Sequence, residues 1–406
     1  MKPNSNYKNL KDSYLFRNIA MKVKAYQEAN PDKHIYRLGI GDVTLPLADE
    51  VVKALHRAVE DQAHAETFHG YMNECGADFL RSAIAGHYKK RGVDLSVDEV
   101  FVSSGASDEL GDILDLFAYG KTTALITEPA YPAYLDASIM AGRRILTLET
   151  GMENGFVPQP GMPVKEWSDS QSDDKTPDVI YICSPNNPTG SVLNRQQLAK
   201  WVEYADSVGA VILFDAAYEA FIEEEDVPHS IFEIEGARTC AIEICSLSKT
   251  AGFTGTRCGY TVIPGELERD GMKLNDMWVR NRTTKTNGVS YIIQRGAEAV
   301  FTDKGREQIQ KNIAVYKENA KCLMKALDAA GISYVGGKNA PYVWMQCPNG
   351  LKSWECFDLL LNEIQVVGTP GAGFGSCGEG YFRFSSFGSP EDTAEAARRI
   401  YELWKS

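Results

Sequence analysis

The most informative segment of this chain is Ser246-Leu247-Ser248-Lys249-Thr250-Ala251-Gly252-Phe253-Thr254-Gly255-Thr256-Arg257. It places one lysine between two serines, with an arginine eight residues further on, in a run rich in small residues. A lysine in such a setting can hold an aldehyde as a Schiff base, while the hydroxyls and the guanidinium bind a phosphate. Pyridoxal 5'-phosphate offers both groups. The same pattern also occurs in ordinary turns, so the case for this cofactor depends on what lies upstream.

Two apolar runs upstream end in polar residues. Residues 178–183 lead into Ser184-Pro-Asn-Asn-Pro-Thr-Gly190, and residues 209–214 end at Asp215, with Tyr218 three positions later. Apolar runs of this length predict buried strands, and polar residues at their carboxyl ends line the crevice where open α/β sheets bind ligands. Asp215 could keep a pyridine nitrogen protonated, with Asn187 and Tyr218 near the ring's 3-oxygen. Singly, these residues also fit a helix cap, a turn and a core position. Their order at successive strand ends favours a cofactor site.

These motifs resemble those of the fold-type I aminotransferases, class I/II branch, and the similarity covers nearly the whole chain. The resemblance implies that Lys249 carries the cofactor and shuttles a proton, that Asp215 pairs with the ring nitrogen, and that Tyr218 acts beside them. It implies further cofactor contacts from the phosphate-binding and ring-stacking positions, namely Ala106, Ser107, Tyr131, Asn187, Ser246, Ser248, Arg257 and Tyr71. Gly105-Ala106-Ser107 follows a strand pattern and opens a helical one, and a helix N-terminus suits a phosphate.

Arg383 lies amid aromatic residues in Tyr381-Phe-Arg-Phe-Ser-Ser-Phe387, which alternates like a strand. A guanidinium there suits bidentate capture of a substrate α-carboxylate, which lysine could not reproduce geometrically. A lone arginine on a strand more commonly faces water. The family resemblance favours the functional interpretation.

Length, composition and charge agree with an enzyme acting on small molecules. The 406 residues exceed what one core usually serves, so two domains are expected. A net charge of −13 argues against nucleic acid as a partner. The nine cysteines include no C-x-x-C pair, and the six histidines show no metal-ligand spacing. Reduced thiols, no apolar leader and no apolar run long enough to span a bilayer predict a cytoplasmic protein without a metal.

The order of patterns along the chain predicts an α/β fold with a mainly parallel sheet covered by helices, plus a smaller α+β domain. We expect an N-terminal arm over 1–48 that joins the small domain, a large cofactor-binding domain over 49–295, and a small domain over 296–406. Strand patterns of the large domain lie at 100–104, 123–127, 144–148, 179–183, 211–214, 241–245 and 258–262, with helical patterns such as 195–207 between them. Those of the small domain lie at 332–335, 342–346, 365–367 and 381–387, after a long helical pattern over 304–330. Residues 158–178 are polar and predict a surface excursion.

The segment Gly373-Phe-Gly-Ser-Cys-Gly378 matches the dinucleotide pattern G-x-G-x-x-G. That pattern binds a dinucleotide only between a strand and a helix of a βαβ unit. Here it falls between two strand patterns, so we interpret it as a loop and not as a nicotinamide site.

Several stretches are similar to the LL-diaminopimelate aminotransferase branch of the family. They are Tyr14-Leu-Phe16, Leu38-Gly-Ile-Gly-Asp-Val-Thr44, Phe68-His-Gly-Tyr-Met-Asn-Glu-Cys-Gly76, Thr286-Asn-Gly288 and Gly337-Lys-Asn-Ala-Pro-Tyr-Val343. The resemblance implies that Glu74 accepts the distal ammonium of the substrate and that Tyr14 and Gly41 lie along it. It also implies that Tyr71 and Asn287 enter the neighbouring subunit's site, in an obligate homodimer. The implied substrate-binding set is Tyr14, Gly41, Tyr71, Glu74, Tyr131, Asn187, Asn287 and Arg383.

This chain departs from the branch near the distal end of the substrate. Ser107 replaces the lysine of many family members, and Met72-Asn73 and Cys75 also differ. Three hypotheses follow. The first is transfer of an amino group between LL-diaminopimelate/tetrahydrodipicolinate and glutamate/2-oxoglutarate in lysine biosynthesis. The second is a general aminotransferase for aspartate, alanine or an aromatic amino acid. The third, a cofactor-binding regulator without turnover, is disfavoured by Lys249 and Asp215.

Overall fold

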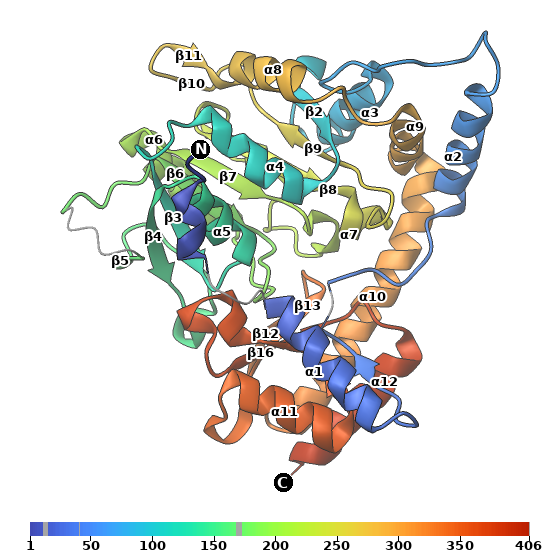
Figure 1. The fold of residues 1–406 in the computed structure, drawn as a ribbon, viewed down its shortest axis with the longest axis vertical. Coiled ribbons are helices and arrows are strands. Elements are labelled where there is room, and N and C mark those ends of the chain that lie inside the picture. Colours follow the sequence, from blue (N-terminus) through green and yellow to red (C-terminus); the bar gives the residue numbers. More distant parts are fainter. Residues whose placement is uncertain (11–14, 40, 168–172, 406) are drawn as a thin grey trace.

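The computed structural model of the chain describes residues 1–10, 15–39, 41–167 and 173–405 (Figure 1). Within them, the larger sheet has eight strands. Their spatial order is β2 (Val100–Ser103), β9 (Gly259–Val262), β8 (Ala241–Ser246), β7 (Val211–Asp215), β6 (Val179–Cys183), β3 (Thr123–Glu128), β4 (Arg144–Glu149) and β5 (Val164–Glu166). All seven strands predicted for the large domain are therefore confirmed.

The direction and burial of these strands confirm the predicted sheet type. Neighbouring strands from β8 to β4 pair in parallel, whereas β9 and β5 run antiparallel to their neighbours. Every residue of β6, β7 and β8 is buried. Strands without an exposed face belong to a sheet that is covered on both sides.

Strand β5 corrects the prediction that residues 158–178 are only a surface excursion. It pairs with β4 at the edge of the sheet, where Arg144 Nε and Glu166 Oε1 form an ion pair of 2.6 Å. A short edge strand that is partly exposed carries little apolar signal, so the sequence did not reveal it.

Helices fill the connections between the strands. They are α2 (Asp49–Asp61), α3 (Asp78–Lys89), α4 (Ala106–Asp112), α5 (Pro132–Met140), α6 (Arg195–Val208), α7 (Leu247–Ala251), α8 (Leu274–Lys285) and α9 (Tyr291–Val300). A short hairpin of β10 (Glu268–Arg269) and β11 (Met272–Lys273) precedes α8. The bounds of α6 follow from its sequence. Asn194 and Gln197 form a capping box at its start, and Gly209 ends it in the left-handed conformation with φ of 73°.

The C-terminal residues build a second sheet in the order β12 (Tyr334–Gly336), β13 (Tyr342–Gln346), β16 (Tyr381–Ser385) and β15 (Thr369–Pro370), all antiparallel. The helices α1 (Leu15–Ala29), α11 (Ser353–Ile364) and α12 (Pro390–Trp404) lie at this end of the molecule (Figure 1). The predicted strand at 365–367 is β14 (Val366–Val367), but it pairs with β1 (Tyr36–Arg37) of the N-terminal arm.

One long helix, α10 (Asp303–Ala329), runs along the molecule between the two sheets (Figure 1). Ile309 and Ile313 belong to the apolar cluster under the large sheet, whereas Leu323 and Leu327 belong to the cluster of the C-terminal sheet. The domain boundaries at 48/49 and 295/296 stay a prediction. In the described residues, no helix combines the length and apolarity that crossing a membrane requires.

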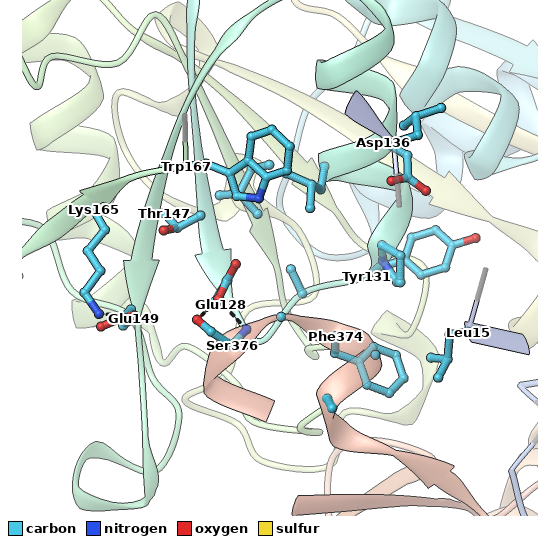
Figure 2. Close-up of a pocket in the computed structure, with 18 of the residues that line it drawn as sticks. Leu15, Glu128, Tyr131, Asp136, Thr147, Glu149, Lys165, Trp167, Phe374 and Ser376 are labelled. Atoms are coloured by element: carbon cyan, nitrogen blue, oxygen red, sulfur yellow. Dashed lines mark hydrogen bonds and ion pairs between the residues drawn. The ribbon is translucent and has the colours of Figure 1, made fainter. Parts of the chain in front are cut away.

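The G-x-G-x-x-G segment lies between β15 and β16, as predicted, and forms two short 3₁₀ turns. The carboxylate of Glu128, at the end of β3, accepts hydrogen bonds from the backbone N–H and the hydroxyl of Ser376, at 3.0 and 2.9 Å (Figure 2). Gly375 has φ of +114°, and a Cβ there would lie 2.7 Å from the Glu128 carboxyl carbon. These glycines therefore let the C-terminal part dock closely on the large sheet.

Candidate active site

A cavity of about 430 Å³ lies at the carboxyl ends of the parallel strands. Twelve of the site residues predicted from the sequence line it together. They are Gly41, Ala106, Ser107, Tyr131, Asn187, Asp215, Tyr218, Ser246, Ser248, Lys249, Arg257 and Arg383. The parallel sheet brings most of them together, because the carboxyl ends of its strands meet at one edge.

Three predicted residues that the structure describes do not line this cavity, and a fourth, Tyr14, lies outside the described residues. Tyr71 is 89% exposed, and neither Glu74 nor Asn287 lines the cavity of this single chain. The segments of Glu74 and Asn287 are nevertheless neighbours, since a Cβ on Gly288 would lie 3.5 Å from the Glu74 Cα. Tyr71, Glu74 and Asn287 therefore lie outside the lining of the cavity in this chain.

One end of the cavity gathers groups that bind anions. Ser246 ends β8 and its hydroxyl caps α7 by accepting the N–H of Ser248 at 3.1 Å. The Arg257 guanidinium donates from Nη1 to the Ser248 hydroxyl at 3.2 Å. Gly105 precedes α4, and a Cβ there would lie only 2.3 Å from Arg257 Nη2. The first N–H groups of α4 are free of helical partners by geometry. Hydroxyls, a guanidinium and a helix N-terminus therefore converge on one place.

Lys249, on α7, also lines the cavity. Its Nζ donates to the carbonyl oxygen of Gly41. Burial lowers the pKa of Lys249 to about 8, against the opposing effect of Asp42, and Arg383 and Arg257 lower it further. A neutral amine is the nucleophilic form, so this environment raises the share of reactive amine near neutral pH.

Asp215 ends β7 and is 6% exposed. Its carboxylate accepts hydrogen bonds from the Tyr134 hydroxyl at 2.5 Å and from the Ala217 N–H at 3.0 Å. Nearby, the hydroxyls of Tyr218 and Tyr342 lie 2.9 Å apart, and Asn187 Nδ2 donates to the Tyr218 hydroxyl at 3.4 Å. The cavity wall therefore holds the buried carboxylate of Asp215 and a hydrogen-bonded series of Asn187, Tyr218 and Tyr342.

Arg383 is 1% exposed, on β16. Its guanidinium donates to three neutral oxygens, which are Asn187 Oδ1 at 2.6 Å, Gly39 O at 2.9 Å and Thr369 Oγ1 at 3.3 Å. Its Nε has no acceptor among the residues that the structure describes. A buried cation whose partners are neutral strongly favours an incoming anion. This arrangement suits capture of a carboxylate.

Tyr134, Tyr342 and Phe374 contact predicted site residues but were not themselves predicted. Tyr134 binds Asp215, and the rings of Tyr342 and Phe374 lie 4.4 and 4.9 Å from the Arg383 guanidinium carbon. The helical spacing between Tyr131 and Tyr134 was a usable signal, since residues three apart share one face. Tyr342 and Phe374 reach the site only through tertiary packing. Figure 2 shows Phe374 and Tyr131 among the residues that line a second pocket, which shares Tyr131 with this cavity.

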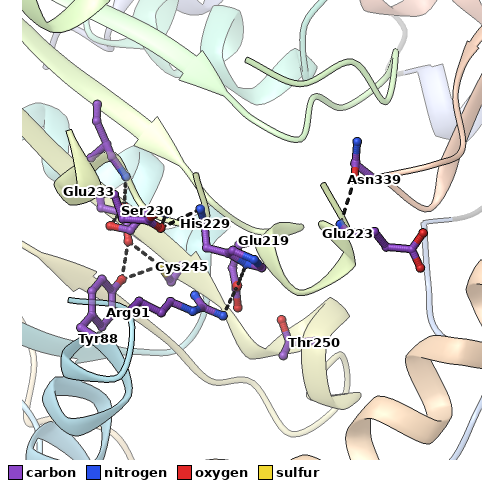
Figure 3. A network of polar contacts seen from close by, with 12 residues as sticks. Tyr88, Arg91, Glu219, Glu223, His229, Ser230, Glu233, Cys245, Thr250 and Asn339 are labelled. Carbon is purple, nitrogen blue, oxygen red and sulfur yellow. Dashed lines mark hydrogen bonds and ion pairs between the residues drawn. The ribbon is translucent and has the colours of Figure 1, made fainter. Parts of the chain in front are cut away.

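A buried polar network surrounds Glu243 of β8, and Figure 3 shows Tyr88, Ser230 and Cys245 of this network. Glu243 accepts hydrogen bonds from the Ser230 hydroxyl at 2.7 Å, from the Ile231 N–H at 2.8 Å and from the Tyr88 hydroxyl. Burial raises the pKa of Glu243 to about 7, against these bonds. The network fixes the strand that ends in Ser246. Over the described ranges, no group of three His, Cys, Asp or Glu side chains is arranged to hold a metal ion.

Comparison with known proteins agrees with this geometry. A family model described as aminotransferase class I and II matches residues 33–400. The LL-diaminopimelate aminotransferases of Lachnospira eligens and Agathobacter rectalis are 52% and 50% identical, over 99% and 98% of this chain and 100% and 99% of their own. The solved structure of L,L-diaminopimelate aminotransferase from Chlamydomonas reinhardtii superposes with a TM-score of 0.92 at 38% identity, covering 100% of this chain and 99% of that one. The chain belongs to the class I and II aminotransferase family.

Proposed function

We propose that this protein transfers an amino group between LL-diaminopimelate/tetrahydrodipicolinate and glutamate/2-oxoglutarate, with pyridoxal 5'-phosphate as cofactor, in lysine biosynthesis. The observation that carries the proposal is the single cavity that joins Lys249, Asp215 and Arg383 in a chain of the aminotransferase family. The specific substrate is supported by the proteins of that name, which are about half identical over the whole chain.

The residues present fit the cofactor. When bound, pyridoxal phosphate supplies an aldehyde that reacts with amines and a protonated ring that withdraws electrons from the substrate Cα. Ser246, Ser248, Arg257 and the start of α4 would hold its phosphate. Asp215 would hold the ring nitrogen. The remaining contacts would come from Asn187 and Tyr218 on the 3-oxygen and from Tyr131 against the ring face.

Lys249 would perform two tasks in sequence. Its amine, with a pKa of about 8, would hold the cofactor's aldehyde group before the substrate binds. Once released, Nζ would accept the proton at the substrate Cα and hold it for return. Both tasks need an amine that is neutral for part of the time, which burial favours.

Arg383 would bind the α-carboxylate of each substrate. Two parallel hydrogen bonds from a guanidinium fix the direction of a carboxylate and hence of the attached Cα. The Tyr342 and Phe374 rings hold the guanidinium plane, so little ordering is left to the moment of binding.

The distal end of LL-diaminopimelate carries a second ammonium and a second carboxylate. We assign the ammonium to Glu74, with Tyr14 and Gly41 along the substrate. Because Tyr71, Glu74 and Asn287 lie outside the cavity of one chain, Tyr71 and Asn287 would complete the site of the other subunit in a homodimer. The cytoplasmic location expected from the sequence stays a prediction.

A half-reaction screen tests the proposal. The holoenzyme is mixed with one amino acid at a time, and the visible absorbance of the cofactor reports amino transfer. We expect conversion with LL-diaminopimelate and with glutamate. Conversion with aspartate or alanine but not with LL-diaminopimelate would leave a general aminotransferase as the function.

Glu74→Ala tests the distal contact. An unpaired charge in a closed site costs about 2–5 kcal/mol, so kcat/KM for LL-diaminopimelate should fall by a factor of at least about 30. Glutamate, which has no distal ammonium, should be affected far less. Glu66→Ala removes another carboxylate from the same surface segment and is the matched control. Equal losses for both substrates would mean that Glu74 only supports the local structure.

A further inference from the structure

The carboxylate of Asp215 is held by two hydrogen-bond donors, a phenol hydroxyl and a backbone N–H. One oxygen, Oδ2, accepts the Tyr134 hydroxyl at 2.5 Å, and the other, Oδ1, accepts the Ala217 N–H at 3.0 Å. An O–H···O distance of this length is typical of a charge-assisted hydrogen bond to an ionised carboxylate. Asp215 lines the cavity, whereas Tyr134 is not part of its lining.

Tyr134 is itself firmly placed. It is 3% exposed, in α5, and its ring stacks on that of Tyr181 with centroids 4.9 Å apart and planes at 19°. On another side the ring of Tyr131 meets it edge-on at 5.8 Å. A ring packed in this way is fixed in place, and its hydroxyl is thereby held within hydrogen-bonding distance of Asp215.

The surroundings of Asp215 oppose its ionisation. Burial raises the pKa of Asp215, and the two hydrogen bonds from Tyr134 and Ala217 lower it. The other titratable side chains next to it are Cys183 on β6 and Tyr218 beyond β7. Burial raises the pKa of Tyr134, Cys183 and Tyr218 well above their usual ranges, so all three are neutral at physiological pH. Asp215 is therefore the group in this cluster whose charge can change.

We propose that Tyr134 is a positioning residue of the reaction, which keeps Asp215 ionised and aims its carboxylate at the cofactor's ring nitrogen. The proposal rests on the proposed role of Asp215 in cofactor binding. The start of α5 would then serve the cofactor in two ways. Tyr131, the N-cap residue, would lie against the ring, and Tyr134 would hold the carboxylate that binds the ring nitrogen.

The test is cofactor binding by the apoenzyme as a function of pH, for Tyr134→Phe and for Tyr181→Phe as control. Both changes remove one buried phenol hydroxyl from the same stacked pair, but only Tyr134 contacts Asp215. Without the donor, Asp215 should take up a proton at a higher pH, by about one pH unit or more. The Kd of Tyr134→Phe for pyridoxal phosphate should therefore rise relative to that of the wild type as the pH falls, by at most about tenfold for each pH unit of that shift, and should differ little near pH 8.5.

Lys249, Arg257 and Arg383 also face the cavity, and their contribution to the pH profile is shared by the wild type and both variants. A Tyr134→Phe profile that coincides with that of Tyr181→Phe would overturn the inference. A second measurement leaves Tyr134 unchanged. The infrared difference spectrum between the wild-type apoenzyme and the Asp215→Asn variant reports whether the Asp215 carboxyl group is protonated. A protonated Asp215 in the wild type near pH 6 would also overturn it.

Asp215→Asn separates this inference from the proposed function. If Asp215→Asn binds the cofactor with wild-type affinity and pH dependence, the assignment of Asp215 itself is wrong. If Asp215→Asn binds weakly and Tyr134→Phe adds no further change in that background, both assignments are supported, because the effect of Tyr134 then passes through Asp215.

Discussion

Replacing Gly105 with alanine is expected to weaken cofactor binding without touching any catalytic side chain. Gly105 joins β2 to α4 with φ of 132° and ψ of 159°, a region that only glycine enters readily. A Cβ at this position would lie 2.3 Å from Nη2 and 3.1 Å from the guanidinium carbon of Arg257. The methyl group and the guanidinium therefore cannot occupy their present positions together.

The magnitude follows from two separate costs. The backbone strain of a residue with a side chain in this region is about 1–3 kcal/mol and lowers the stability of the apoenzyme. Displacing Arg257 would remove the charged hydrogen bond that it is proposed to donate to the phosphate, worth about 1.5–3 kcal/mol, and should raise the Kd for pyridoxal phosphate about 10- to 100-fold. The two costs appear in different measurements, namely denaturant unfolding of the apoenzyme and cofactor titration.

Gly111→Ala is the matched control, because Gly111 lies in the same helix α4 and a Cβ there meets no atom within 4 Å. It should bind the cofactor normally and be slightly more stable, by about 0.5–1 kcal/mol. In an Arg257→Ala background, Gly105→Ala should raise the Kd little further. A Gly105→Ala protein with wild-type cofactor affinity would refute this account of the phosphate site.

Three further outcomes are expected. Borohydride reduction of the holoenzyme should fix the cofactor on the peptide that contains Lys249, as mass spectrometry would show. The Lys249→Ala variant should lose multiple turnover. Label on another lysine would contradict the assignment. Asp215→Ala should lower the half-reaction rate in stopped flow by several orders of magnitude, with a smaller loss of cofactor affinity, since its charge acts mainly on the chemical step; a near-normal rate would mean that another group holds the ring nitrogen. For Glu243, the raised pKa of about 7 means that its stabilising contribution is fully present below its ordinary value of 4.5 and is lost as pH rises through 7. The stability difference between the wild type and Glu243→Gln should therefore change by about 3 kcal/mol over this range in urea unfolding of the apoenzyme, and a constant difference would show that Glu243 does not titrate there.

The site residues at strand ends could be predicted from the sequence because a parallel sheet brings the ends of its strands together. Asp215, Ser246 and Asn187 each follow an apolar run, and a parallel arrangement of those runs places all three at one edge. Local signals were sufficient for the strands, since β6, β7 and β8 are buried on both faces and read as continuous apolar runs.

The contacts that the sequence did not predict join segments that lie far apart along the chain. Tyr342 lies 124 positions from Tyr218, and no local pattern announces that their hydroxyls meet. Strand β14 has the expected apolar sequence, but its partner β1 consists of only two residues of the arm. Similarly, the G-x-G-x-x-G pattern gives the positions of the glycines but does not predict which residues they contact. The contact that requires Gly375 is a carboxylate, Glu128, on another sheet.

Asn187 connects the two halves of the proposed chemistry. Its Oδ1 accepts a hydrogen bond from Arg383 at 2.6 Å, and its Nδ2 donates to the Tyr218 hydroxyl at 3.4 Å. A charged donor on the oxygen polarises the amide, which makes its N–H groups stronger donors. Asn187 therefore links the position proposed for the substrate carboxylate to the position proposed for the ring oxygen through one side chain.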